Sequence, residues 1–367
     1  MTDGYAAANR AFNETGLNIT ENALEPITPH TSAAPRSSTN VVVRVSSLVK
    51  TYRVAEKKEV GVLSALKSIF HRTYKQVEAV AGLSFEIEAG EMIAFLGPNG
   101  AGKTTTLKIL SGLIFPTSGT ATVLGYVPWE RANEYRRRFA LVMGQKNQLW
   151  WDLPARESFR LHKEIYDIPE SDFQKIHDEL VDLLSLQKLI NQPVRELSLG
   201  ERMKMELVAA LLHGPKVLFL DEPTIGLDVV AQTQLRDFLK RYNRMRAVTI
   251  VLTSHYMKDV ESLCQRAVII NHGKKIFDGS LEQIISEFST HKILKLQFAD
   301  SMPQDLTAYG DVLEMKPPVA TLRVPRARVA GILAKIFDEH RLADVTVDEV
   351  PLEEVIADVF KSSKPEA

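Results

Sequence analysis

The feature that most constrains this chain is a glycine-rich segment from Gly97 to Thr104, with the sequence Gly-Pro-Asn-Gly-Ala-Gly-Lys-Thr. It follows the apolar run Met92–Leu96 and precedes a helical stretch at residues 105–113, so it joins a predicted strand to a predicted helix. Glycines allow several backbone N–H groups to turn inward, and a helix start adds partial positive charge. The pattern is typical of a loop that binds phosphate, and it predicts an α/β fold with a parallel sheet.

Two pairs of side chains add chemistry to this loop. Lys103 can supply positive charge to terminal phosphates, and the Thr104 hydroxyl can ligate Mg²⁺. Asp221 and Glu222 follow the apolar run 217–220, which predicts a buried strand that ends in two carboxylates. Because α/β proteins bind ligands at the carboxyl ends of strands, Asp221 fits a Mg²⁺ shell and Glu222 fits a general base that activates water.

The segment 197–202 indicates the subclass of phosphate-binding protein. Its sequence, Leu-Ser-Leu-Gly-Glu-Arg, resembles the Leu-Ser-Gly-Gly-Gln signature of the ATP-binding cassette (ABC) ATPases. Leucine stands at the first glycine and Glu201 at the glutamine, whereas Ser198 and Gly200 are kept. The resemblance assigns this segment to the γ-phosphate of an ATP bound by the opposite subunit. A helix N-terminus suits that role, although a serine there also acts as a simple N-cap.

Four further positions match the ABC family in order along the chain. Tyr52 stands where the family stacks an aromatic ring on adenine, although it also reads as an ordinary strand residue. Gln145 stands at the Q-loop position, which contacts Mg²⁺ or the attacking water, although it also reads as a surface glutamine. Asp228 ends the match to the D-loop between subunits, and His255 matches the switch histidine that reaches the γ-phosphate and orients Glu222.

The resemblance therefore implies a complete ATP and Mg²⁺ site. The implied catalytic residues are Glu222, His255, Lys103 and Gln145, and the implied Mg²⁺ ligands are Thr104, Gln145 and Asp221. The implied nucleotide contacts are Tyr52, Gly97, Pro98, Asn99, Gly100, Ala101, Gly102, Lys103, Thr104, Thr105, Ser198, Gly200, Glu201 and Asp228.

The expected architecture is a P-loop NTPase of the ABC cassette type followed by a small α+β domain. The cassette spans residues 41–285 and contains a parallel-sheet core, an antiparallel β subdomain and a helical subdomain. Alternating strand-like stretches and two apolar helical stripes predict the α+β domain at residues 290–367. Residues 1–40 are rich in Ala, Thr, Asn, Ser and Pro, which predicts a disordered tail.

Two local features concern partners. The insertion at residues 53–77 is predicted to be a basic amphipathic helix, which could lie against anionic lipid or a membrane subunit, or could be a solvated surface segment. Trp150 and Trp151 lie in a stretch that in the ABC family faces the coupling helices of a transmembrane subunit. They could equally pack into the helical subdomain of the cassette itself.

Composition excludes a global attraction to nucleic acid or lipid. The chain of 367 residues has 45 Lys and Arg against 46 Asp and Glu, a net charge of -1. Its single cysteine, Cys264, fits a reducing compartment. No run approaches the ~20 apolar residues of a spanning helix, and no secretory signal is evident at the N-terminus. We therefore expect a peripheral protein on the cytoplasmic side of the cell membrane, with no nucleic acid partner.

The expected function is that of an ATP-hydrolysing subunit of an ABC-type membrane transporter. One phosphate loop and one signature segment cannot complete a site alone, so a homodimer or a cassette heterodimer is predicted, together with separate transmembrane permease subunits. The insertion, the Trp-Trp stretch and the C-terminal unit resemble ATPases of ABC-2-type exporters, the group that includes drug-resistance and sodium-efflux ATPases. The alternatives are an importer subunit, or a soluble ABC ATPase that acts in translation or on DNA.

Overall fold

The computed structural model describes residues 40–55, 74–144 and 146–362. The tail expected at the N-terminus lies outside these ranges except for its last residue, and so do Gln145 and the centre of the insertion. The apolar face predicted for a helix in that insertion falls entirely within the part that is not described.

The core is a six-stranded sheet in the order β5-β6-β7-β3-β8-β9. Five strands run parallel, and β9 pairs antiparallel with β8. The strands are β3 (Met92–Leu96), β5 (Phe139–Met143), β6 (Val217–Asp221), β7 (Thr249–Thr253), β8 (Arg266–Asn271) and β9 (Lys274–Ser280). Every residue of β6 and β7 is buried, as expected for parallel strands that are covered on both faces.

Helices surround this sheet. In chain order they are α3 (Lys103–Leu110), α4 (Asn133–Arg136), α5 (Ala155–Tyr166), α6 (Glu170–Leu184), α7 (Leu199–Leu211), α8 (Val229–Arg246), α9 (Met257–Leu263) and α10 (Leu281–Phe288), with the short turns η1 (Pro128–Glu130) and η2 (Val194–Glu196). Among the helices described for this chain, none combines the length and the apolar character needed to cross a bilayer.

A second, antiparallel sheet has the order β2-β1-β4. Its strands are β1 (Val41–Ala55), β2 (Tyr74–Glu88) and β4 (Ser118–Val123). In β2, residues from Leu83 to Glu88 alternate between buried and exposed positions, which is the pattern of a strand with one face on a core. The ring of Phe85 meets Phe95 of the core sheet edge to face, with ring centroids 4.9 Å apart. The two sheets therefore share one hydrophobic cluster.

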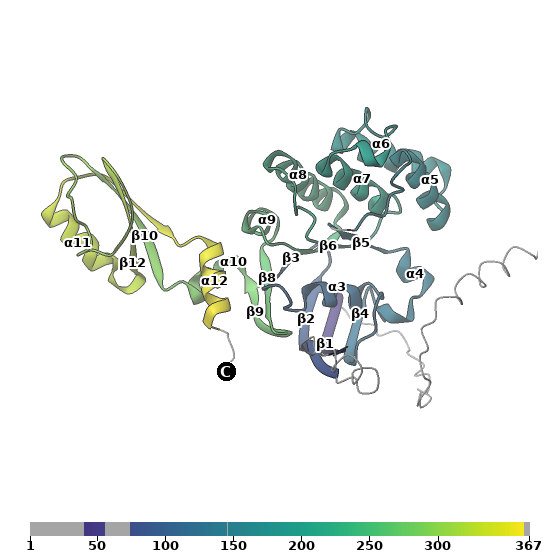
Figure 1. Ribbon diagram of the computed structural model, residues 1–367, viewed down its shortest axis with the longest axis horizontal. Coiled ribbons are helices and arrows are strands. Elements are labelled where there is room, and N and C mark those ends of the chain that lie inside the picture. The colour runs from purple at the N-terminus through teal and green to yellow at the C-terminus, as the bar shows by residue number, and fades with distance from the viewer. Residues whose placement is uncertain (1–39, 56–73, 145, 363–367) are drawn as a thin grey trace, which may run out of the picture. The chain divides into compact units, whose positions relative to one another are not determined.

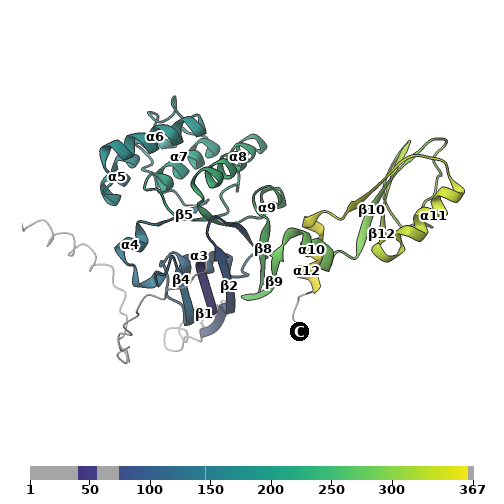
Figure 2. The ribbon, with the colours of Figure 1, turned by 180° about the vertical axis from the view of Figure 1, so that it is seen from behind.

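Alternate residues of the core strands face opposite clusters. Ala94 and Leu218 belong to the cluster that the helices α5 to α8 cover, whereas Ile93 and Phe219 face the antiparallel sheet and α3. This follows from the period of two along a strand. Figure 1 shows the resulting layers, with α5, α6, α7 and α8 on one side of the core sheet and α3, β1, β2 and β4 on the other; Figure 2 shows them from behind.

The ends of the 53–77 insertion are strand rather than helix. Arg53 pairs with Gln76 and Val54 with Lys75, so β1 and β2 continue their ladder past Tyr52. This corrects the prediction of an amphipathic helix for these flanking residues. The reason is that β-branched and aromatic residues favour strands, and continued pairing satisfies backbone groups that a helix end would leave free.

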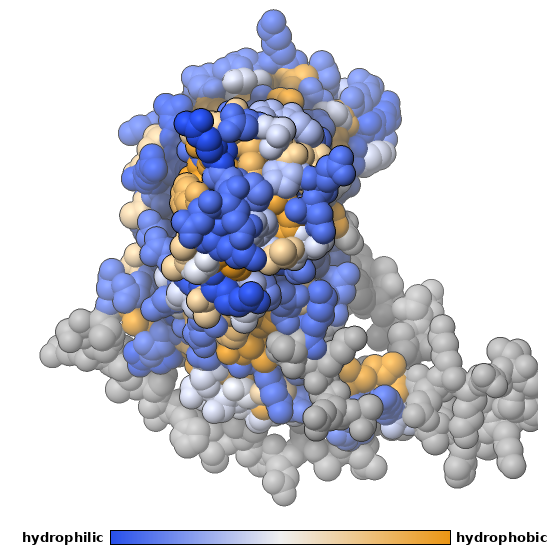
Figure 3. Space-filling model, turned by 90° about the vertical axis from the view of Figure 1, so that its left-hand side faces the viewer, coloured by the Kyte–Doolittle hydropathy of each residue, from blue (hydrophilic) through white to orange (hydrophobic). Residues whose placement is uncertain are grey.

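The C-terminal region contains a four-stranded antiparallel sheet in the order β11-β12-β10-β13. Its elements are β10 (His291–Phe298), β11 (Asp311–Lys316), β12 (Val319–Pro325), the turn η3 (Arg326–Arg328), α11 (Val329–Glu339) and β13 (Leu342–Glu349). Leu294 and Leu296 of β10 pack with Ile332 and Ile336 of α11 in a separate cluster. Figure 3 shows the side of the molecule that carries this sheet, which is mostly hydrophilic with small apolar patches.

The last helix, α12 (Leu352–Ser362), belongs to the cassette core rather than to this sheet. Its apolar stripe, which includes Val355 and Ile356, joins the same cluster as Ile284 of α10. This corrects the expectation that residues 290–367 form one separate unit. Sequence periodicity identified the stripe, but it cannot tell which of two cores the stripe covers.

Replacing Ile356 with alanine should destabilise the cassette by about 2–4 kcal/mol, because the change leaves a cavity in its core. The measurement is urea unfolding followed by tryptophan fluorescence, since all three tryptophans lie in the cassette (Trp129, Trp150 and Trp151). Glu353→Ala, on the exposed face of α12, is the control and should leave the transition in place. An unchanged transition in Ile356→Ala would show that α12 does not belong to this core.

Candidate functional site

The candidate site lies at the carboxyl edge of the core sheet, where three neighbouring strands end. β3 leads into the glycine-rich segment, β6 ends at Asp221 and β7 ends at Thr253, and β7 lies between the other two. Parallel strands present their carboxyl ends at one edge, so segments more than a hundred residues apart in sequence meet there. The structure thus brings together the phosphate loop, Asp221, Glu222 and His255.

The phosphate loop fits its surroundings only with glycine at two positions. A Cβ atom at Gly97 would lie 2.2 Å from the carbonyl oxygen of Ile270, at the end of β8. A Cβ atom at Gly102 would lie 2.3 Å from the carbonyl oxygen of Ala79 in β2, and Gly102 has a φ of +105°. The loop is therefore held between the two sheets, with Asn99 and Gly100 exposed at its tip.

Lys103 holds a buried positive charge within this loop. Its side chain lies at the start of α3, and the residue is only 5% exposed. Its Nζ donates to the carbonyl oxygens of Gly97 at 2.6 Å and Pro98 at 3.1 Å. Burial lowers the pKa of Lys103, while the nearby carboxylates of Glu222 and Asp221 act in the opposite direction. The ammonium group is thus preformed at the position where a phosphate would lie against the loop.

One carboxylate oxygen of Asp221 accepts hydrogen bonds from two hydroxyl groups. Its Oδ1 accepts from Thr253 Oγ1 at 2.7 Å and from Thr104 Oγ1 at 3.1 Å. The first bond fixes the carboxylate against β7, and the second places it beside the phosphate loop. A threonine hydroxyl and a carboxylate are the hard oxygen donors that Mg²⁺ takes together with water and phosphate oxygens. The pair therefore fits a magnesium site.

Glu222 and His255 form a contact on the accessible side of the edge. His255 Nε2 lies 2.7 Å from Glu222 Oε1, and their side chains are 40% and 20% exposed. Glu222 has a φ of +54°, which is uncommon for a residue other than glycine. Its N–H donates to both the carbonyl oxygen and the hydroxyl of Thr253, each at 3.0 Å. These bonds hold the Glu222 backbone in this conformation beside the end of β7.

The signature-like segment lies at the start of α7, where Ser198 is the N-cap residue. Ser198 and Glu201 form a capping box, in which the Ser198 N–H donates to Glu201 Oε2 at 2.8 Å and the Glu201 N–H donates to Ser198 Oγ at 3.3 Å. The serine hydroxyl also donates to Glu201 Oε2 at 2.8 Å. A Cβ atom at Gly200 would lie 2.8 Å from the Cβ of Ala231 in α8. The segment is therefore closely packed against α8, and Glu201 orders the serine that the resemblance assigns to phosphate.

Tyr52 and Asp228, two further residues predicted for the site, are both exposed. Tyr52 is a half-exposed residue of β1, and the Nζ of Lys50 lies 5.2 Å from its ring centroid. Asp228 is the N-cap residue of α8 and accepts from the N–H of Ala231 at 2.8 Å. Thr105 is partly buried in α3.

Comparison with known proteins adds family evidence to this geometry. Residues 80–225 match the family model described as "ABC transporter". Residues 290–348 match the model described as "EvrA-like ABC transporter, C-terminal domain". The protein is 32% identical over 215 residues to the "ABC transporter ATP-binding protein NatA" of Bacillus subtilis, covering 59% of this chain and 87% of that one.

The protein belongs to the ABC transporter ATP-binding proteins. It is also 32% identical over 293 residues to the "Linearmycin resistance ATP-binding protein LnrL" of Bacillus subtilis, covering 77% of this chain and 93% of that one. It is 36% identical over 214 residues to the "Nod factor export ATP-binding protein I" of Burkholderia thailandensis, covering 58% and 70%. The expected ABC ATPase class and the resemblance to ATP-binding subunits of exporters are confirmed.

The fold is shared with solved ABC cassettes. A dimeric cassette in a post-hydrolysis state, bound to ADP and phosphate, superposes with a TM-score of 0.53 at 22% identity, covering 65% of this chain and 98% of that one. The expected fold class is confirmed, namely an ABC cassette with a parallel sheet, an antiparallel subdomain and a C-terminal domain.

Sequence analysis missed two residues of this ABC cassette that hold Glu222. A Cβ atom at Gly144 would lie 2.1 Å from the carbonyl oxygen of Glu222, and the Gly144 N–H donates to the Asp221 carbonyl at 2.9 Å. Thr253 is the second, through its bonds to Asp221 and Glu222. The sequence signal that could have identified them is their position beside predicted site residues. Gly144 directly precedes Gln145, and Thr253 ends the strand before His255.

The exposed tryptophans of the cassette lie in a stretch that contacts α7. Trp150 and Trp151 are 47% and 45% exposed, and the guanidinium of Arg202 lies 4.4 Å from the ring centroid of Trp151. Buried Glu206, one turn further along α7, accepts from the N–H groups of residues 148 and 149 at 2.8 and 3.3 Å. Burial raises the pKa of Glu206. The aromatic stretch therefore contacts the same helix that Ser198 begins.

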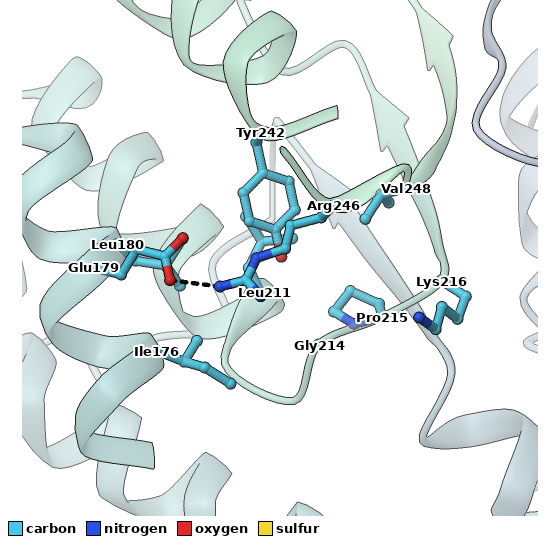
Figure 4. A pocket seen from close by; sticks show the side chains of 10 residues that line it. All are labelled: Ile176, Glu179, Leu180, Leu211, Gly214, Pro215, Lys216, Tyr242, Arg246 and Val248. Carbon is cyan, nitrogen blue, oxygen red and sulfur yellow. Dashed lines mark hydrogen bonds and ion pairs between the residues drawn. The ribbon is translucent and has the colours of Figure 1, made fainter. Parts of the chain in front are cut away.

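One pocket of the cassette lies away from the phosphate loop and the carboxylates Asp221 and Glu222. Figure 4 shows its lining, with the ion pair of Glu179 and Arg246 spanning α6 and the end of α8. Lys216 and Val248, which also line it, directly precede β6 and β7. The pocket is therefore at the amino edge of the core sheet, opposite to the edge that carries the phosphate loop.

Replacing Gly144 with alanine should lower both stability and ATP hydrolysis. The added methyl group would clash with the Glu222 carbonyl, so the backbone that aims Glu222 must shift. We expect a loss of about 1–3 kcal/mol in unfolding free energy and at least about a tenfold loss of kcat. Gly331→Ala is the control, because a Cβ atom there meets open space. Normal turnover in Gly144→Ala would contradict this account of Glu222.

Proposed function

We propose that this ABC cassette hydrolyses ATP between two copies of the chain and that hydrolysis drives export through separate membrane subunits. The observation that carries the proposal is the contact of Glu222 with His255 beside Asp221, at the edge where the phosphate loop begins. A carboxylate next to a preformed phosphate cradle can act on a water molecule aligned with the terminal phosphate.

Binding relies on the loop and its neighbours. The backbone N–H groups of residues 99–105 and the Lys103 ammonium surround the phosphates, and Tyr52 stacks on adenine. Thr104 and Asp221 would hold Mg²⁺, with Gln145 as the further ligand that the family resemblance implies. Bound there, Mg²⁺ would neutralise charge on the β- and γ-phosphate oxygens.

Hydrolysis in this proposal uses Glu222 as the general base. Its carboxylate takes a proton from water while the water oxygen forms a bond to the γ-phosphorus, and the bond from phosphorus to the bridging oxygen of ADP breaks. His255 positions the carboxylate through the 2.7 Å contact and can donate a ring N–H to a γ-phosphate oxygen. The products are ADP and inorganic phosphate, and Lys103 stays charged throughout.

The second copy supplies the signature segment. Ser198 is ordered by Glu201 at the N-terminus of α7, where unpaired N–H groups favour an anion. Asp228, at the start of α8, would contact the other copy. The dimeric cassette among the solved structures of this fold supports this arrangement. A homodimer is the simplest assembly, and closure around ATP followed by reopening after hydrolysis would supply the motion.

The motion would be passed to transmembrane permease subunits. The exposed surface formed by Trp150, Trp151 and Leu153 suits such a contact, because aromatic anchors dominate protein interfaces. This surface is linked to α7 by Arg202 and Glu206. The relatives described for resistance and for Nod factor export support export as the direction. Peripheral attachment to the cytoplasmic face of the membrane follows from this assembly.

Glu222→Gln should abolish hydrolysis while ATP still binds. The amide keeps the shape of the side chain but cannot take the proton, so kcat should fall at least about a hundredfold. The measurements are phosphate release at saturating ATP and sedimentation of the protein with ATP, which should show a persistent dimer. Glu261→Gln, an exposed carboxylate of α9, is the control. Near-normal turnover in Glu222→Gln would exclude it as the base.

Mixing two inactive variants tests whether each site is shared between copies. Lys103→Ala removes the phosphate-loop charge, and Ser198→Arg blocks the signature segment. If each site uses one segment from each chain, a mixed dimer contains one intact site. An equimolar mixture should then regain up to about a quarter of wild-type turnover, since about half of randomly formed dimers are mixed. A mixture as inactive as its two components would argue against shared sites.

A further inference from the structure

Asp259 is a fully buried carboxylate that contacts three side chains from three parts of the chain. It lies in the first turn of α9 and has no exposed surface. Its Oδ2 accepts from the hydroxyl of Thr224 at 2.5 Å and from that of Ser254 at 2.9 Å. Its Oδ1 accepts from Arg236 Nη1 of α8 at 2.8 Å.

Two of these partners adjoin the residues proposed for hydrolysis. Thr224 follows Glu222 by two residues, and Ser254 directly precedes His255. One oxygen of Asp259 therefore joins the two segments on their buried side, while Glu222 and His255 meet on the accessible side at 2.7 Å. The distance between the two segments is therefore fixed by two sets of contacts, the hydroxyl bonds to Asp259 on the buried side and the contact of Glu222 with His255 on the accessible side.

Stability alone does not account for a charged group at this position. Arg236 is only 11% exposed in its side chain, so both members of the pair have lost most of their hydration. The attraction within a buried ion pair often fails to exceed that loss, and apolar side chains of similar volume are frequently as stabilising. What an apolar residue cannot do is accept two hydroxyl groups on one atom.

Backbone geometry shows why this acceptor matters. Glu222 has a left-handed φ of +54°, and the turn that follows it reaches Thr224 within two residues. Ser254 also accepts from the N–H of Tyr256 at 3.0 Å, so its hydroxyl fixes the chain on both sides of His255. Strained segments of this kind persist only where the surroundings hold them.

We propose that Asp259 is a positioning residue for ATP hydrolysis, which sets the spacing of the segments that carry Glu222 and His255 through the shared hydroxyl bonds of Thr224 and Ser254. The inference rests on the proposed roles of Glu222 and His255. Arg236 donates to the other carboxylate oxygen of Asp259 and so connects it to α8, which begins directly after Asp228.

Two double variants separate positioning from packing. Asp259→Asn with Arg236→Met removes both charges and leaves an amide oxygen that can accept from Thr224 and Ser254. Asp259→Leu with Arg236→Met removes the acceptor as well, at similar volume. We expect the asparagine variant to keep kcat within about threefold of wild type, and the leucine variant to lose at least about tenfold, with the KM for ATP unchanged in both.

The controls make each outcome decisive. Glu261→Leu, on the exposed side of the same helix, should leave kcat unchanged. Equal kcat values in the two double variants would overturn the proposal, because packing alone would then explain Asp259. If the leucine variant does not fold, Thr224→Val and Ser254→Ala provide the test. Each should lower kcat, with effects that do not add when combined, and unchanged kcat in both would overturn the proposal.

Glu222→Gln measured in parallel separates this inference from the proposed function. If Glu222→Gln abolishes hydrolysis and the leucine variant turns over normally, only the role of Asp259 fails. If Glu222→Gln turns over normally, the assignment of the base fails, and the role of Asp259 fails with it. Loss of kcat in both Glu222→Gln and the leucine variant, with the asparagine variant active, supports both.

Discussion

The site depends on the junction at which β6 and β7 end side by side. There Thr253 donates its hydroxyl to Asp221, and both its carbonyl and its hydroxyl oxygen accept from the N–H of Glu222. These bonds fix two adjacent carboxylates in different directions, one toward the phosphate loop and one toward His255. This arrangement depends on the parallel register of the two strands, which places Asp221 opposite Thr253.

Buried ionisable side chains recur in this cassette. Lys103, Glu206 and Asp259 are all nearly or fully buried, and each is held by named hydrogen bonds to backbone or side-chain partners. Lys103 belongs to the phosphate loop, Glu206 joins the aromatic stretch to α7, and Asp259 joins the segments of Glu222 and His255. Because a buried polar group without a partner is costly, these hydrogen bonds constrain the positions of both the ionisable groups and their partners.

Much of the fold could be predicted from local patterns. The apolar runs before Gly97 and Asp221 are core strands, and a stretch of alternating residues at Leu83 and Phe85 is part of the antiparallel sheet. Predictions failed where one pattern fits two environments. The ends of the 53–77 insertion continue the pairing of β1 with β2. The helix α12 covers the cassette core, because an apolar stripe in the sequence shows that a helix face is buried but not which surface it packs against.

The sequence by itself determined the family and the order of its motifs, because the glycine loop, the paired acids and the signature segment require fixed residue types at fixed spacing. Only the tertiary structure decided which residues hold them in place. Gly144, Thr253 and Asp259 carry no motif, and they act through contacts between strands and helices distant in sequence. Such contacts follow from strand order and close packing, which no local pattern encodes.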